Sequence, residues 1–208
     1  MRKAAMICLV VACAAGLGPQ AWAQGWGVEF KAGFSLARIH ETSDEPLIVA
    51  WTDLPFFAAG LSLEGPGLAS IEPEILYVQQ GGKYDIDAAN GLTNRYHYLQ
   101  IPVQLRISPV RAGTVRPFVA AGGYGAYLIR ADSILKVDDV PTKADVTSEY
   151  VRWDWGIIGS AGLAFKMPGI TLSVEARYNL GLVNILKNPV AGDSLKTRCL
   201  MALIGLRY

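Results

Sequence analysis

Charged side chains occupy alternate positions within several apolar segments of the chain, so that they share one face of each segment. The charges are of both signs and nearly balanced. Because buried charges must be paired or hydrated, the chemistry that this pattern predicts is a network of ion pairs and water. The predicted charge network consists of Glu29, Lys31, Glu72, Glu74, Arg106, Arg152, Asp154, Glu175 and Arg177. Glu64 and Arg207 fall on the same face.

Acid–base catalysis is a second chemistry that carboxylates could support. Glu72 and Glu74 are two residues apart and share a face of their segment, as a catalytic pair would. Arg106 and Arg177, in other segments, give a structural reason for the same two carboxylates. We therefore interpret the pair as part of the charge network.

Nucleophilic catalysis would require a histidine beside a serine and a carboxylate. Of the two histidines, His40 falls in a connection, and His97 is in phase with the apolar positions of its segment. The sequence pairs no serine with His97, and it contains no CxxC or HExxH motif. We therefore predict no catalytic residue, no metal site and no cofactor.

The elements that hold these side chains are predicted to be β-strands, because the apolar residues between the charges also recur with a period of two. In the last segment the alternating apolar residues are Leu200, Ala202, Ile204 and Leu206. Most segments exceed the soluble mode of about 5–6 residues and match the roughly 9–11 residues that cross a bilayer at a tilt. The eight predicted strands are 26–36, 56–64, 70–80, 95–107, 116–129, 150–165, 170–183 and 194–208.

The connections between these segments alternate between long and short along the chain. The long connections are 37–54, 81–94, 130–149 and 184–193. Outer-membrane barrels have long external loops and short periplasmic turns, and a soluble meander has no reason to sort its loops in this way. We therefore predict an all-β fold, a closed eight-stranded antiparallel up-and-down transmembrane β-barrel in the bacterial outer membrane, with both termini periplasmic.

Aromatic residues fall near the ends of the predicted strands, where the two interfaces of a bilayer would lie. The predicted interface aromatics are Trp26, Phe118, Trp153, Trp155, Phe165, Tyr178 and Tyr208. The expected partners are outer-membrane lipid, the barrel-assembly machinery acting on the C-terminal strand, and an extracellular or envelope protein bound through the long connections.

Residues 1–23 have the features of a secretory signal peptide, because a basic start and an apolar run precede Ala21-Trp22-Ala23. The alternative is a lipoprotein cleavage box that ends at Cys13, which would then carry lipid. The predicted barrel domain spans 24–208. It contains Cys199 as its one cysteine, which we interpret as a small buried apolar group.

The composition excludes some classes of function. The chain has 208 residues, of which 51% are hydrophobic and 18% charged, with a formal net charge of +1. This length indicates one domain, and the near-zero charge provides no basic footprint for nucleic acid. No apolar run after the signal segment reaches the about 18–20 residues of a transmembrane helix.

Several different short motifs follow one another along most of the predicted barrel domain. They include Gly33-Phe34-Ser35, Glu72-Pro73-Glu74-Ile75-Leu76-Tyr77, Tyr98-Leu99-Gln100-Ile101-Pro102, Pro117-Phe118-Val119-Ala120-Ala121-Gly122 and Arg177-Tyr178-Asn179-Leu180-Gly181-Leu182. In these motifs the chain resembles the PorT-type outer-membrane β-barrel family, common in Bacteroidetes-like bacteria. The resemblance implies an eight-stranded barrel in the outer membrane. It implies no particular role, because the family is broad and only one branch assists a protein secretion system.

Three functional hypotheses follow from these observations. The first is a non-enzymatic barrel with a structural or surface-binding role and a charge-plugged lumen, and a narrow polar pore is its variant. Another is a soluble periplasmic lipocalin-like lipid carrier, which would place Phe30, Leu61 and Leu105 inside and the charges in water. The last is an outer-membrane lipid-modifying enzyme that uses His97. The direction in which the charged face points separates the membrane barrel from the soluble carrier.

Overall fold

The computed structural model describes residues 26–42, 55–85, 90–110, 113–138, 140–188 and 194–208. The predicted signal peptide with Cys13 lies outside the described residues, as does most of the first long connection. Within the described ranges, no helix has both the length and the apolar character needed to cross a membrane.

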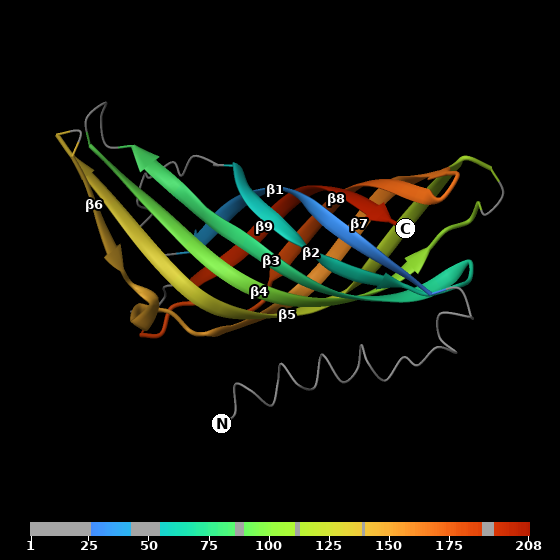
Figure 1. Cartoon of the computed structure of the whole chain (residues 1–208). Helices are drawn as coiled ribbons and strands as arrows, with labels where there is room; N and C mark the ends of the chain where they lie inside the picture. The colour runs from blue at the N-terminus through green and yellow to red at the C-terminus, as the bar shows by residue number, and fades with distance from the viewer. Residues whose placement is uncertain (1–25, 43–54, 86–89, 111–112, 139, 189–193) are drawn as a thin grey trace, which may run out of the picture.

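The described residues form nine strands in one antiparallel sheet, and eight of these strands close into a ring (Figure 1). The strands are β1 (Gly27–Thr42), β2 (Pro55–Glu64), β3 (Ala69–Asp85), β4 (Gly91–Ile107), β5 (Val115–Val137), β6 (Val140–Asp145), β7 (Trp153–Met167), β8 (Ile170–Gly181) and β9 (Ser194–Arg207). β1 pairs with both β2 and β9, and the pairing of β4 with β5 completes the ring. The predicted closed barrel of eight strands is confirmed.

The two ends of the ring differ in their connections. One end, here called the turn end, carries the short connections 65–68, 108–114 and 168–169. β1 begins and β9 ends there too, because Glu29 near the start of β1 pairs with Arg207 (Figure 1). The opposite end, here called the loop end, carries the longer connections, and β3, β4, β5 and β6 extend there beyond the other strands (Figure 1).

Side chains alternate between the two faces of the wall, as a period of two requires. Phe30 is 53% exposed, whereas its sequence neighbours Glu29 and Lys31 are each 1% exposed. Ile204 is 58% exposed, whereas its sequence neighbour Leu203 is 1% exposed. The apolar face therefore points outward and the charged face into the lumen. The lipocalin-like alternative needed the reverse arrangement and is wrong.

The lumen is filled over much of its height by side chains from the inward face. An apolar layer from β1, β2, β3 and β9 contains Ala37, Ala58, Leu76, Val78, Cys199, Met201 and Leu203. Toward the loop end a second apolar cluster contains Tyr96 and Tyr98 together with Leu128 and Ile158. An eight-stranded barrel has an interior just wide enough for this kind of filling.

Strand β5 is the one whose two faces the alternation assigned wrongly. As a predicted interface aromatic, Phe118 was expected outside, together with Tyr124 and Leu128, which share its phase of the alternation, but each is 5% exposed or less and points inward. Both faces of β5 are apolar, so a period of two cannot tell them apart. Phe118 therefore is not an interface aromatic, because its ring lies over Gly162, where a Cβ would be 2.4 Å from a ring carbon.

The predicted connection 130–149 is mostly structured. β5 continues to Val137, turns at Asp138 with a positive φ of 49°, and pairs with β6. A short 3-10 helix, η1 (Thr147–Glu149), then leads to β7. Because this segment is polar, the alternation of apolar residues did not predict the extended hairpin that it forms. The predicted connection 81–94 is likewise shortened, since residues 81–85 pair with residues 91–95.

Candidate functional site

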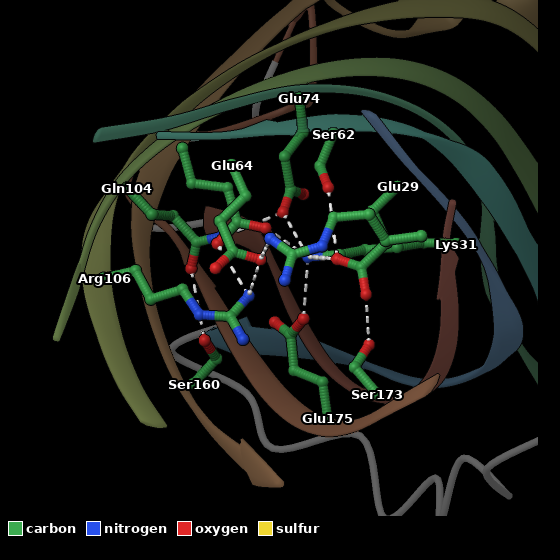
Figure 2. A network of polar contacts seen from close by, with 12 residues as sticks. Glu29, Lys31, Ser62, Glu64, Glu74, Gln104, Arg106, Ser160, Ser173 and Glu175 are labelled. Atoms are coloured by element: carbon green, nitrogen blue, oxygen red, sulfur yellow. Dashed lines mark hydrogen bonds and ion pairs between the residues drawn. The ribbon is translucent and has the colours of Figure 1, made fainter. Parts of the chain in front are cut away.

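Lys31 on β1 lies at the centre of the inward charges (Figure 2). Its Nζ donates to Glu72 Oε1 at 2.8 Å, to Glu74 Oε1 at 2.7 Å and to Glu175 Oε2 at 2.9 Å. All four side chains are 2% exposed or less. An ammonium group has three donors, and here each donor has a carboxylate, from β3 on one side and β8 on the other.

Arg177 makes the second connection across the lumen, between β8 and β3. Its Nη1 and Nη2 donate to the two oxygens of Glu74 at 2.6 and 2.8 Å, and its Nε donates to Glu175 Oε1 at 2.8 Å. The bidentate fork with Glu74 has the geometry that suits a planar guanidinium group. Arg177 is 0% exposed, so the pair is shielded from water.

Two further groups extend the network toward the turn end. Glu29 accepts a hydrogen bond from Ser173 Oγ and a longer one from Ser62 Oγ at 3.4 Å, and it lies 3.8 Å from Lys31 Nζ (Figure 2). Arg106 Nη1 lies 3.5 Å from carboxylate oxygens of Glu64 and Glu72. Its guanidinium carbon is 3.6 Å from the centroid of the Phe118 ring.

The structure brings together seven of the nine residues predicted for the charge network. They are Glu29, Lys31, Glu72, Glu74, Arg106, Glu175 and Arg177, and we keep the name charge network for these seven. Each carboxylate has a cationic partner, because an isolated charge in this interior would be costly. The network connects strands on opposite sides of the ring.

Asp154 and Arg152 do not join this network. Asp154 is buried but belongs to a separate polar group toward the loop end, where it accepts hydrogen bonds from Thr197 Oγ1 at 2.8 Å and Tyr124 Oη at 3.4 Å. Arg152 is exposed, because it precedes β7 and its direction is not set by the strand alternation. It donates to the Leu128 carbonyl at 3.4 Å.

The remaining predicted interface aromatics lie on or near the outer face. Trp153, Trp155 and Tyr178 are 52%, 58% and 45% exposed on the outward side of β7 and β8. Trp26 and Phe165 are partly exposed, and both lie at the turn end with Tyr208. Tyr127, which was not predicted for this group, packs edge-to-face on Trp153 with ring centroids 5.0 Å apart.

His97 belongs to an outward-facing polar cluster that the sequence did not reveal. Its Nδ1 lies 2.5 Å from Tyr77 Oη, and its Nε2 lies 3.5 Å from Asp132 Oδ2. Asp132 is also paired with Arg130 at 2.7 Å and Lys143 at 3.0 Å. The register shift of the β4–β5 pairing falls between His97 and Tyr98, so a bulge on β5 positions these groups.

Hydroxyl and amide partners of the network were also missed by sequence reasoning. Ser62 and Ser173 bind Glu29, and Gln104 donates to Glu74 Oε1 at 3.2 Å. All three occupy inward positions of their strands, so the phase of the alternation was a usable signal for them.

Comparison with solved structures gives the same fold. The barrel is similar to the outer membrane protein OprG from Pseudomonas aeruginosa, with a TM-score of 0.56 at 12% identity over 89% of this chain and 96% of that one. It is also similar to Neisserial surface protein A, with a TM-score of 0.50 at 13% identity over 88% and 96% of the two chains. No curated protein matches the sequence.

The family follows from a separate comparison of the sequence. Residues 22–187 match the family described as outer membrane protein beta-barrel domain. This range includes β1 to β8 and every member of the charge network. The chain therefore belongs to the outer membrane protein beta-barrel domain family.

Proposed function

We propose that this protein is a non-enzymatic outer-membrane barrel whose lumen is closed by the charge network and whose loop end binds a partner outside the cell. The observation that supports it best is the pairing of Lys31 and Arg177 with carboxylates from both sides of the ring. In this proposal the turn end faces the periplasm, in keeping with the short turns of outer-membrane barrels.

A closed lumen follows from the energy of separating these groups. An ion that crossed the barrel would have to displace Arg177 from Glu74 or Lys31 from its three carboxylates, all of them 2% exposed or less. Removing one partner of a buried ion pair costs about 3–5 kcal/mol. A barrier of this kind supports a structural or binding role over the narrow-pore variant.

The loop end presents a surface for binding that is built on paired strands. β5 and β6 form a hairpin beyond the ring, and all six residues of β6 are exposed. Three residues of the long connections are candidate contacts for such a partner: Tyr84 lies within β3, Asp138 lies in the turn of this hairpin, and Trp51 lies outside the described residues. A rigid hairpin presents side chains with a smaller ordering cost than a free loop.

Single-channel recording after refolding into planar bilayers tests the closed lumen. We expect no regular conductance steps from the unmodified protein or from a version without the β5–β6 hairpin. We expect steps from the Arg177→Ala variant, because the direct contact of β8 with β3 through this side chain is removed. Regular steps from the unmodified protein would refute the closed lumen, and cell-surface labelling of the hairpin tests the orientation.

A lipid-modifying enzyme is the second candidate, supported by one observation. His97 lies between the Tyr77 hydroxyl and the Asp132 carboxylate on the outer wall, where a lipid would be within reach. Lipid A acylation measured with the unmodified protein and with His97→Ala decides this point. Identical lipid A acylation in a strain that makes the unmodified protein and in a strain that makes His97→Ala excludes the enzyme. The loss of one modified lipid A species from the His97→Ala strain establishes it.

We further propose a PorT-type position within the family and a signal peptide that ends at Ala23. The order of the motifs along β1, β3, β4, β5 and β8 supports the first assignment. The Ala21-Trp22-Ala23 sequence supports the second. N-terminal sequencing of the purified protein should begin at Gln24, whereas a lipid-modified Cys13 at the N-terminus would contradict the cleavage site.

A further inference from the structure

A cavity of about 360 Å³ opens at the turn end, below the charge network. Three arginines from three different strands line it, namely Arg106 of β4, Arg116 of β5 and Arg207 of β9. The only carboxylate among the lining residues described is Glu64 of β2. The charge that surrounds the cavity is therefore positive.

The pairing of these arginines is incomplete. Arg207 Nη1 binds Glu64 Oε2 at 2.7 Å, so the one carboxylate of the cavity is already engaged. The nearest carboxylates to Arg106 are 3.5 Å away. The side chain of Arg116 has no hydrogen bond or ion pair with any residue that the structure describes. The Nε atoms of both Arg106 and Arg116 are buried and have no acceptor within the described chain.

Such donors are expected to have partners, because a buried polar group without one loses its hydration and gains nothing in return. Arg106 is 2% exposed and its guanidinium group stacks on Phe118 at 3.6 Å, which limits its movement. The guanidinium fork matches carboxylate and phosphate oxygens in a bidentate geometry. The cavity volume also lies within the range of about 300–1,000 Å³ seen for small-molecule sites.

We propose that this cavity binds a small oxyanion, a compound that carries a phosphate or carboxylate group, with Arg116 as the principal contact. Arg106 forms the floor of the site and Arg207 its side, and Glu64 holds Arg207 in place. The anion would restore the missing acceptors of Arg116 and Arg106. The proposal concerns the end opposite to the surface-binding hairpin and holds whether or not that hairpin has a partner.

Isothermal titration calorimetry tests this site on the protein refolded in a zwitterionic detergent at low salt. The probes are inorganic pyrophosphate and citrate, one for each oxyanion chemistry. We expect saturable one-site binding of at least one probe and at least a tenfold loss of affinity in Arg116→Gln. Lys166→Gln is the matched control, because Lys166 is an exposed cation of β7 at the same end and does not line the cavity.

Two further measurements keep the result interpretable. Arg116→Lys retains the charge and loses the fork, so it should bind more weakly than the unmodified protein and should fold normally. Nanodiscs with and without phosphatidylglycerol separate the possible sources of the anion. Competition by this lipid assigns the site to a headgroup, and unchanged binding assigns it to a soluble compound. The absence of saturable binding for both probes, or equal affinities for the unmodified protein and Arg116→Gln, would overturn the proposal.

Discussion

At the scale of single residues, Lys31 is the cation that compensates the largest number of buried carboxylates. Its ammonium group is the shared partner of Glu72, Glu74 and Glu175, which would otherwise be like charges confined in one small interior. Arg177 compensates two of the three, and Glu72 otherwise has Arg106 at 3.5 Å. The network is therefore least tolerant of change at Lys31.

Replacing Lys31 by methionine should destabilise the folded barrel by about 3–5 kcal/mol, because it removes the cation that three buried carboxylates share. Urea unfolding in lipid vesicles measures the change. Lys166→Met is the control, since Lys166 is exposed, and it should stay within about 0.5 kcal/mol of the unmodified protein. A loss of the same size in both variants would show that the network does not hold the barrel together.

Gly205 leaves the space that the Glu29 carboxylate occupies. A Cβ at this position would lie 2.2 Å from Glu29 Oε1 and 2.3 Å from Ser173 Oγ. Gly205→Ala should therefore destabilise the barrel by about 1–3 kcal/mol through overpacking. Gly125→Ala, on the outward face of β5 with nothing within 4 Å, should be neutral. Equal unfolding midpoints for the two variants would contradict this account of Gly205.

The residue scale also shows what the sequence could and could not predict about the site. The inward direction of Lys31, Glu74 and Arg177 followed from a period of two, which fixes the face once the strand is known. The contact of Arg177 with Glu74 could not be predicted, because β8 and β3 are not neighbours in the ring. Their relative height depends on the tilt and stagger of all the strands between them.

At the scale of elements, the β5–β6 hairpin and η1 form the least expected part of the fold. Thr147 of η1 attaches the hairpin to the ring. Its Oγ1 accepts a hydrogen bond from the Ala131 amide at 2.8 Å and donates to Asp145 Oδ1. Ala131 and Thr147 are both buried, which makes this junction a packed contact and not a loose loop.

The Asp145 carboxyl should report the state of this junction. Hydrogen bonds from the Thr147 hydroxyl and amide hold the pKa of Asp145 below its ordinary value of 3.8. A lowered pKa means that the contact is complete above that ordinary value and weakens as the pH falls through the lowered one. Thr147→Val removes the hydroxyl donor and should raise the pKa of Asp145.

NMR titration of the Asp145 side-chain carbon measures this pKa. Ser148→Ala is the control, because Ser148 is exposed and, within the described part of the chain, only its carbonyl accepts a hydrogen bond, from Lys187 Nζ at 3.4 Å. The control should leave the pKa of Asp145 unchanged. If Thr147→Val also leaves it unchanged, the hydroxyl of Thr147 does not secure the junction.

Strand prediction succeeded where one face was charged and failed where both faces were apolar or both polar. β1 and β8 carry charge on one side only, so their faces were assigned correctly. The half of β5 nearer the turn end has apolar residues on both faces, such as Phe118 on one and Val119 on the other, and no pattern separates the two faces. The loop-end part of β5 and all of β6 lie beyond the ring. A strand there needs no apolar outer face, so the alternation that predicts strands in the ring is missing.

At the scale of the whole molecule, the barrel is a ring of eight strands with an apolar exterior and a charged interior. Outer-membrane lipid surrounds such a ring in the proposed setting, and closure leaves no sheet edge in the wall. β9 completes it through β1 and β8, and its outward residues include Leu200 and Ile204. These residues should meet acyl chains, while Met201 and Leu203 should not.

Methyl NMR of the protein in nanodiscs, with a nitroxide on the lipid acyl chain, measures this directly. The structure predicts strong broadening of the Leu200, Ile204 and Val119 methyl signals and little broadening of those of Met201 and Leu203. Similar broadening on both sides of β9, or broadening of the inward residues alone, would contradict the arrangement of lipid outside and ion pairs inside.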